Sequence, residues 1–173
     1  MHCRLRHILD GTILGRVILL TVTLVMAVGS MDPGNAQAQT DGPRLFRSKS
    51  SYDDVRFELN NAIIARGLNI TAVGNIADML DRTGPDLGAT KKIYKAAEYL
   101  SFCSAKLSRQ MMEADPANLA FCPFVIVIYE AIDKPGETVV AYRPLIASGN
   151  DASKAAIAEA DKLLEGIARD ATK

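Results

Sequence analysis

Two stretches of the chain repeat apolar residues at the spacing of a helix with one buried face. The first begins after Ser51, a typical N-cap residue, and ends before Gly67, the residue type that commonly follows a last helical turn. The second runs from Asp151 to about Ala171. Both are predicted to be amphipathic helices that pack on an apolar layer. The positions that define the two stripes are Val55, Leu59, Ala62 and Ile63, and then Ala156, Ala160, Leu163, Leu164 and Ile167.

Five shorter segments have the alternation or the β-branched composition of strands. The run 124–129, FVIVIY, is continuously apolar, which predicts a central strand covered on both faces. The turn sequence DKPGE follows at 133–137, so segment 138–143 is predicted to return as the hairpin partner. The remaining predicted strands are 44–49, 68–74 with Leu68, Ile70 and Ala72 on one face, and 96–103 with Leu100 and Phe102 opposite Tyr99 and Ser101.

Two further helices are predicted between these strands. Asn75 can cap a short helix over 76–83, which Gly84-Pro85 ends because proline cannot continue a helix, and the polar stretch 86–92 is predicted to be a loop. Ser104 can cap a second helix that ends at Ala114, before Asp115-Pro116. Strands with enough helix to cover one face predict a single α+β domain with a largely antiparallel sheet.

Residues 1–38 have the layout of a secretory signal peptide. Three arginines accompany twelve uncharged residues at 17–28, too few to span a bilayer, and Ala36-Gln37-Ala38 supplies an A-x-A cleavage site. These small residues disfavour the alternative, an uncleaved N-terminal anchor. We expect cleavage after Ala38, a flexible lead-in at 39–43, and a periplasmic or secreted mature protein without a membrane segment.

The charge and the histidine content narrow the possible functions. Lys plus Arg total 20, as do Asp plus Glu, so the chain lacks the basic excess that nucleic-acid binding requires, and no nucleic-acid partner is expected. The only two histidines, His2 and His7, lie in the predicted signal peptide. A mature chain without imidazole cannot use Ser-His-Asp or Cys-His nucleophile activation, or a histidine-ligated zinc or copper site.

Cys103 and Cys122 are the two cysteines of the expected mature chain. Antiparallel strands that end at 103 and begin at 124 would return the chain to where it left, and an oxidising compartment favours joining the two sulfurs. We therefore predict a structural disulfide. The alternative is thiol redox chemistry, or copper bound by both sulfurs with Met111 or Met112 as thioether ligands. Against it, no Cys-x-x-Cys is present and adjacent methionines on a helix point in different directions.

Three carboxylates are weaker candidates for a pocket. Asp86 follows Gly84-Pro85, and Glu113 and Asp115 close the predicted helix that begins after Ser104. Carboxylates in such positions commonly cap helices or form turns, and no acid/base pair can be distinguished among them. The sequence therefore favours a non-catalytic module without a cofactor that binds an unidentified small molecule or protein. A cleft that holds all three carboxylates would instead indicate a carboxylate enzyme.

The segments FCSAKLS at 102–108, MEADP at 112–116 and FCPF at 121–124 resemble the domain of unknown function 302 family, in an exported bacterial branch with paired cysteines. The resemblance implies an α+β domain over 44–146, similar to half of the TATA-binding-protein fold and often dimeric, followed by a further C-terminal helix over 147–173. It implies no established activity, and likeness to a DNA-binding fold is not evidence of function. Shorter cytoplasmic relatives have glycine and an aliphatic residue at the two cysteine positions, and this joint change suits a bridge.

Overall fold

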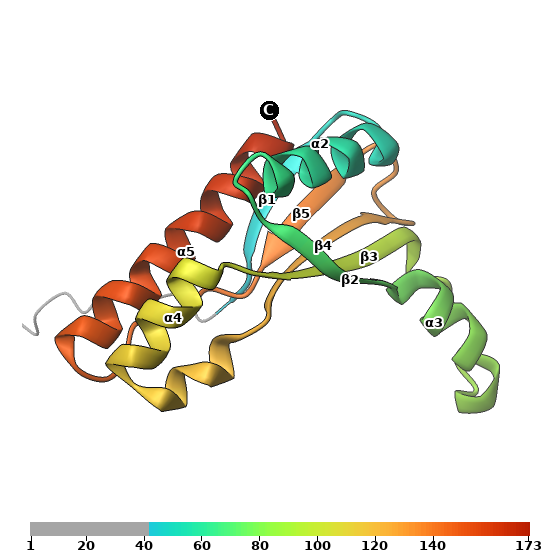
Figure 1. Ribbon diagram of the computed structural model, residues 1–173. Coiled ribbons are helices and arrows are strands. Elements are labelled where there is room, and N and C mark those ends of the chain that lie inside the picture. Colours follow the sequence, from blue (N-terminus) through green and yellow to red (C-terminus); the bar gives the residue numbers. More distant parts are fainter. Residues whose placement is uncertain (1–41) are drawn as a thin grey trace, which may run out of the picture. The chain divides into compact units, whose positions relative to one another are not determined.

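The computed structural model describes residues 42–173, which form a five-stranded sheet with helices against one side (Figure 1). The strand order is β1-β5-β4-β3-β2, and every neighbouring pair is antiparallel. The predicted signal peptide and its cleavage site lie outside the described residues. The strands are β1 (Arg44–Ser48), β2 (Asn69–Asn75), β3 (Tyr94–Cys103), β4 (Phe124–Ala131) and β5 (Thr138–Tyr142). The helices are α2 (Tyr52–Ile64), α3 (Ile76–Thr83), α4 (Ala105–Ala114) and α5 (Asp151–Ala171), with 3-10 turns η2 (Pro85–Leu87) and η3 (Pro116–Phe121).

Each helix begins at a residue whose side chain caps it. The Ser51 hydroxyl accepts a hydrogen bond from the Asp54 amide at the start of α2, and Asn75 and Ser104 do the same for α3 and α4. Asn150 caps α5 by accepting from the Ser153 amide. The three caps predicted from the sequence are confirmed, because a capping bond depends only on residues three apart in the chain.

The core lies between the sheet and the helices α2, α4 and α5. Phe102 and Phe124, from neighbouring strands, pack edge to face at 6.2 Å. Leu59 of α2 and Ile157 and Leu164 of α5 are also completely buried in this core. The predicted single α+β domain and its C-terminal helix are therefore confirmed, and α5 is an integral part of the core. In residues 42–173 no helix is long and apolar enough to cross a membrane.

Two strand predictions were wrong in detail. β4 is the central strand, but only one of its faces is covered: Ile126 and Ile128 are completely buried, whereas Val125 is 41% exposed. In β2 the register shifts between Ile70 and Ala72, so the predicted alternation fails there and Ala72 is exposed. A bulge adds a residue to one strand only, which composition does not reveal.

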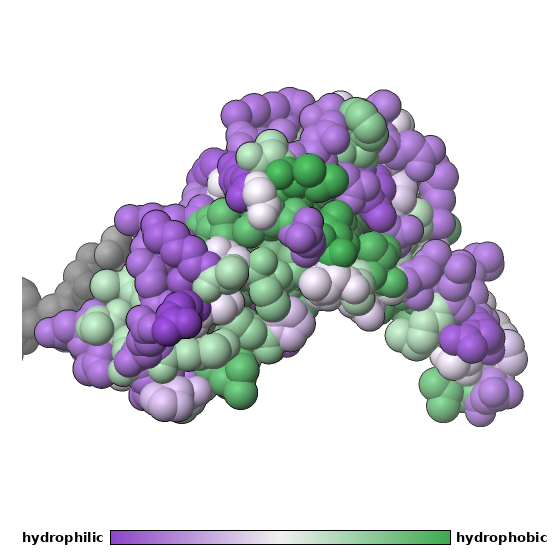
Figure 2. All heavy atoms as spheres, in the orientation of Figure 1, coloured by the Kyte–Doolittle hydropathy of each residue, from purple (hydrophilic) through white to green (hydrophobic). Residues whose placement is uncertain are grey.

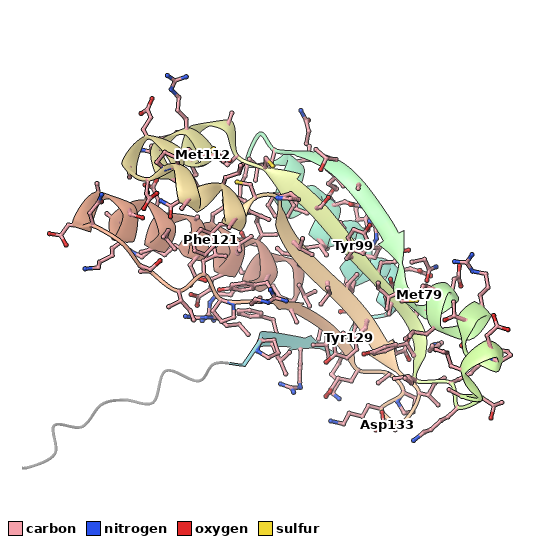
Figure 3. All side chains as sticks on the ribbon, turned by 90° about the horizontal axis from the view of Figure 1, so that it is seen from below. Met79, Tyr99, Met112, Phe121, Tyr129 and Asp133 are labelled. Atoms are coloured by element: carbon pink, nitrogen blue, oxygen red, sulfur yellow. The ribbon has the colours of Figure 1, made fainter. Side chains whose placement is uncertain are left out.

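The uncovered side of the sheet, the open face, carries Tyr99, Val125, Val127 and Tyr129. Figure 3 looks at the sheet from below and shows Tyr99 and Tyr129 on this side, with α2 behind the strands. The Tyr99 ring lies over Gly74, where a Cβ atom would overlap it. Seen from the direction of Figure 1, apolar residues gather over β2, where Val73 is 47% exposed, between mainly hydrophilic helix surfaces (Figure 2).

Candidate functional site

Cys103 and Cys122 lie together at one end of the sheet. Cys103 ends β3, Cys122 precedes β4 by two residues, and the strands are paired up to Phe102 opposite Phe124. The Cys122 thiol is near enough to raise the pKa of the Cys103 thiol. Both are free, so the predicted disulfide is not present in this structure. The antiparallel register explains why the two cysteines approach each other, as the sequence predicted. Cys103 faces position 123, so Cys122 lies one residue before the position directly opposite it.

The surroundings of the two thiols differ. Cys103 is exposed and Cys122 is half-buried, with its sulfur 3.4 Å from the hydroxyl of Ser108 in the first turn of α4. Desolvation raises the pKa of the Cys103 thiol, and the neighbouring Cys122 thiol raises it further. A raised pKa keeps Cys103 protonated at neutral pH, whereas a nucleophilic cysteine requires the thiolate. The raised pKa therefore disfavours catalysis by a cysteine nucleophile at this site.

The methionine candidates for metal binding are separated by the structure. Met111 is completely buried in the core, so it is not available as a thioether ligand for a surface ion. Met112 is partly exposed and lies one turn beyond Ser108 on the same side of α4 (Figure 3). Among residues 42–173, no group of three or more His, Cys, Asp or Glu side chains could hold a metal ion.

The three candidate carboxylates do not share a pocket. Asp86 is exposed in η2, beyond α3, while Glu113 and Asp115 lie at the end of α4, and Figure 1 shows α3 and α4 at opposite ends of the sheet. Glu113 pairs with Arg109 at 2.7 Å, and Asp115 caps η3 by accepting from the Ala117 amide at 2.8 Å. These are the ordinary roles of surface carboxylates, and their separation removes the basis for a carboxylate enzyme.

A second candidate site, which the sequence did not reveal, is a row of polar residues on the core side of the sheet. Ser48, Thr138 and Glu130 lie directly opposite one another on β1, β5 and β4, and all three are buried. The Thr138 hydroxyl donates to the Ser50 carbonyl at 3.1 Å. The one signal in the sequence was Glu130, a charged residue directly after the apolar run of β4.

A cavity of about 440 Å³ opens over this row, between the start of α2 and the turn that joins β4 to β5. Its walls include Tyr52, Lys95 and Glu130. The Glu130 carboxylate accepts from the Gly136 amide at 3.0 Å and from the Lys95 ammonium at 3.1 and 3.3 Å. These hydrogen bonds lower the pKa of Glu130, and the bond from the Gly136 amide contributes most. Glu130 is therefore ionised at neutral pH.

Tyr52 is the unusual member of the cavity wall. Its hydroxyl is buried and has no hydrogen-bond partner among the described residues. Burial and the charge of Glu98 raise the pKa of Tyr52 above its usual range. A buried phenol normally finds a partner, because an unsatisfied polar group is costly in a protein interior. The hydroxyl has almost no accessible surface, so the cavity presents the ionised Glu130 carboxylate and not this hydroxyl.

The model of one protein family, Domain of unknown function DUF302, matches residues 46–171. The chain belongs to this family. The DUF302 match includes α5. The crystal structure of an uncharacterized conserved DUF302 protein from Bacillus stearothermophilus is similar, with a TM-score of 0.61 and 15% identity, covering 76% of this chain and 98% of that one. At this identity the DUF302 likeness supports the fold alone. No match was found among curated proteins.

Proposed function

We propose that the protein is an exported, periplasmic or secreted module that binds a ligand without catalytic turnover, and that a disulfide between Cys103 and Cys122 stabilises it there. The binding role is supported chiefly by the cavity over the buried polar row, with its ionised Glu130 carboxylate. Pockets of several hundred cubic ångströms with a few placed polar groups are the usual form of small-molecule sites. The export step is supported by the signal-peptide pattern of residues 1–38.

The disulfide is supported by the proximity of the two sulfurs at the end of the paired strands β3 and β4. In the oxidising step, each thiol loses one proton, and the pair passes two electrons to a disulfide of the compartment, which is reduced to two thiols. Joining residues 103 and 122 restricts the unfolded chain, which stabilises the fold by about 3 kcal/mol. In a domain of this size, that free energy corresponds to roughly 10 °C in melting temperature.

The test uses the full chain, exported by its own leader and purified without reductant. We expect an N-terminus at Gln39, a mass two hydrogens below that of the dithiol, and no thiol that reacts before reduction. Reduction is expected to lower the melting temperature by roughly 10 °C. The double variant Cys103→Ser/Cys122→Ser serves as the control, and its melting temperature should not respond to reductant. Two free thiols in the exported protein would contradict this proposal.

A second function is favoured by the exposure of Cys103 beside Cys122. The two sulfurs as a dithiol would suit thiol/disulfide exchange or the binding of Cu(I), for which thiolates are preferred ligands. Of the two candidate methionines on α4, only Met112 is partly exposed. Titration of the reduced protein with Cu(I) against a competing chelator tests this alternative. Tight binding of one equivalent that the single variants Cys103→Ser and Cys122→Ser each abolish would favour it. Binding no tighter than that of the double variant would exclude it.

A further inference from the structure

The polar row beneath the cavity directly follows an apolar part of the core. One register step further into the sheet, Ile128 and Val140 are completely buried and apolar, whereas Glu130 and Thr138 occupy the next positions on the same side. Apolar side chains at positions 130 and 138 would fill the same space without the cost of desolvating a carboxylate. A buried carboxylate that lines a cavity is therefore a candidate for ligand binding.

The charges around the cavity differ in how firmly they are held. The Glu130 side chain is 5% exposed and is fixed by the Gly136 amide. Lys95 and Lys49 are 67% and 82% exposed, on flexible side chains, and Lys49 also pairs with Glu137 at 3.5 Å. Lys49 can move into solvent at little cost, because both it and its surroundings are solvated. Lys95 can leave only if another cation takes its place, because a buried carboxylate without a counter-charge is costly. The charge that an entering ligand must meet is consequently negative.

The Lys95 ammonium indicates what fits against this carboxylate. Its nitrogen lies 3.1 and 3.3 Å from the two oxygens of Glu130. We propose that the cavity binds a small primary amine whose ammonium group replaces that of Lys95 on Glu130. This inference rests on the binding role proposed above and specifies its ligand class.

The Tyr52 hydroxyl does not extend this assignment to a second group of the ligand. It is buried with almost no accessible surface, and the charges that act on it most strongly are those of Glu98 and Arg56, so the cavity does not present it to a ligand. The ligand class is therefore a small primary amine that is held through its ammonium group. Figure 1 shows the start of α2, which carries Tyr52, beside the turn between β4 and β5.

The opposite class, a small carboxylate, fits less well. It would have to approach the fixed Glu130 charge and compete with it for Lys95. The positive end of the α2 dipole also faces this region, but Asp53 and Asp54 in the first turn of α2 offset it. The two classes make opposite predictions for removal of Lys95, which competes with an amine and would assist an anion.

The experiment uses three matched probes: ethanolamine, ethylamine and glycolate, each added to ¹⁵N-labelled protein at constant ionic strength. We expect ethanolamine and ethylamine to produce saturable shifts of the Gly136 and Tyr52 amide signals, and glycolate to produce none. The Glu130→Gln variant, whose amide oxygen can still accept from Gly136, should bind ethanolamine about tenfold more weakly, as expected for the loss of a charge-assisted hydrogen bond.

Three further variants separate the ligand classes. Lys95→Met should bind ethanolamine more tightly than the wild type, and it keeps Glu130 and the hairpin turn, so it tests the inference even if Glu130→Gln does not fold. Tyr52→Phe should leave the binding of both amines unchanged, because the hydroxyl it removes is not accessible from the cavity. Lys106→Met, the matched loss of an exposed lysine on α4, should change neither.

Several results would overturn the inference. Saturable glycolate binding that Lys95→Met abolishes would show an anion site, and equal shifts with all three probes would show a response to salt alone. Failure of both amines to bind, with the disulfide present in the exported protein, would refute the amine site and leave the proposed stabilisation by Cys103 and Cys122 intact. Binding of the amines to an exported protein with two free thiols would support the amine site and refute the proposed disulfide.

Discussion

Replacing Asn118 with alanine is expected to destabilise the part of the chain that lies between the two cysteines. Asn118 belongs to η3, and its side chain is buried. Its amide nitrogen donates to the Met111 carbonyl of α4 at 2.8 Å and to the Ser153 hydroxyl of α5 at 2.7 Å. This single side chain therefore connects η3 to both neighbouring helices.

The expected loss follows from the two hydrogen bonds. The Met111 carbonyl retains its hydrogen bond from the Asp115 amide at 3.1 Å, so it loses only one of its two hydrogen bonds. The Ser153 hydroxyl is completely buried, and a buried polar group that loses its partner costs about 1–3 kcal/mol. Together the two losses predict a decrease of about 2–3 kcal/mol in the free energy of unfolding, or roughly 10 °C in melting temperature.

Urea denaturation under reducing conditions measures this decrease. We expect a lower midpoint with an unchanged m-value, because the surface exposed on unfolding stays the same. In a double-mutant cycle, Asn118→Ala and Ser153→Ala should be coupled by about 1 kcal/mol, since each removes the partner of the other. A decrease below about 0.5 kcal/mol, the range of ordinary surface substitutions, would refute the reasoning, as would strict additivity of the two variants.

Three further predictions concern single side chains. Gly74→Ala places a Cβ atom against the Tyr99 ring and should cost about 1–3 kcal/mol in chemical denaturation, a penalty that Tyr99→Ala should relieve. Burial raises the pKa of Tyr142 from 10.0 to about 12, so between these pH values the folded state retains a proton that the unfolded state loses. This contribution to stability is complete below pH 10 and should disappear as the pH rises to about 12. Phenolate absorbance measures the titration, and circular dichroism measures the loss of stability. Met111→Ala should cost about 2–5 kcal/mol because it leaves a core cavity, whereas Met112→Ala should change the melting temperature little.

The sequence was sufficient for those features that depend on neighbouring residues. The caps at Ser51, Asn75 and Ser104 are set by bonds to residues three positions on, and the helices follow from them. The approach of Cys103 to Cys122 also followed from a local rule, because antiparallel strands return the chain to its starting edge. The oxidation state of the sulfurs depends on the compartment as well, and a chain pattern does not set it.

The polar row and its cavity could not be predicted from the sequence. Ser48 is far from Glu130 and Thr138 in the chain, and the three residues meet only through the register of β1, β5 and β4. Register depends on turn geometry and on which face is buried, and a shift of one residue would move all three side chains to the open face. The same dependence explains why the exposure of Val125 was missed: an apolar run does not show that only one side of its strand is covered.

The unequal exposure of Cys103 and Cys122 has a consequence for how the two positions can change in evolution. Loss of both sulfurs would remove the proposed covalent link but leave Asn118 in place to hold the intervening segment, so a pairwise exchange is compatible with an intact backbone. Loss of Cys122 alone would instead leave an accessible thiol at the end of a strand, ready to cross-link one molecule to another under oxidising conditions. Single substitutions should therefore be selected against in an exported protein, and lineages should gain or lose the two cysteines as a unit.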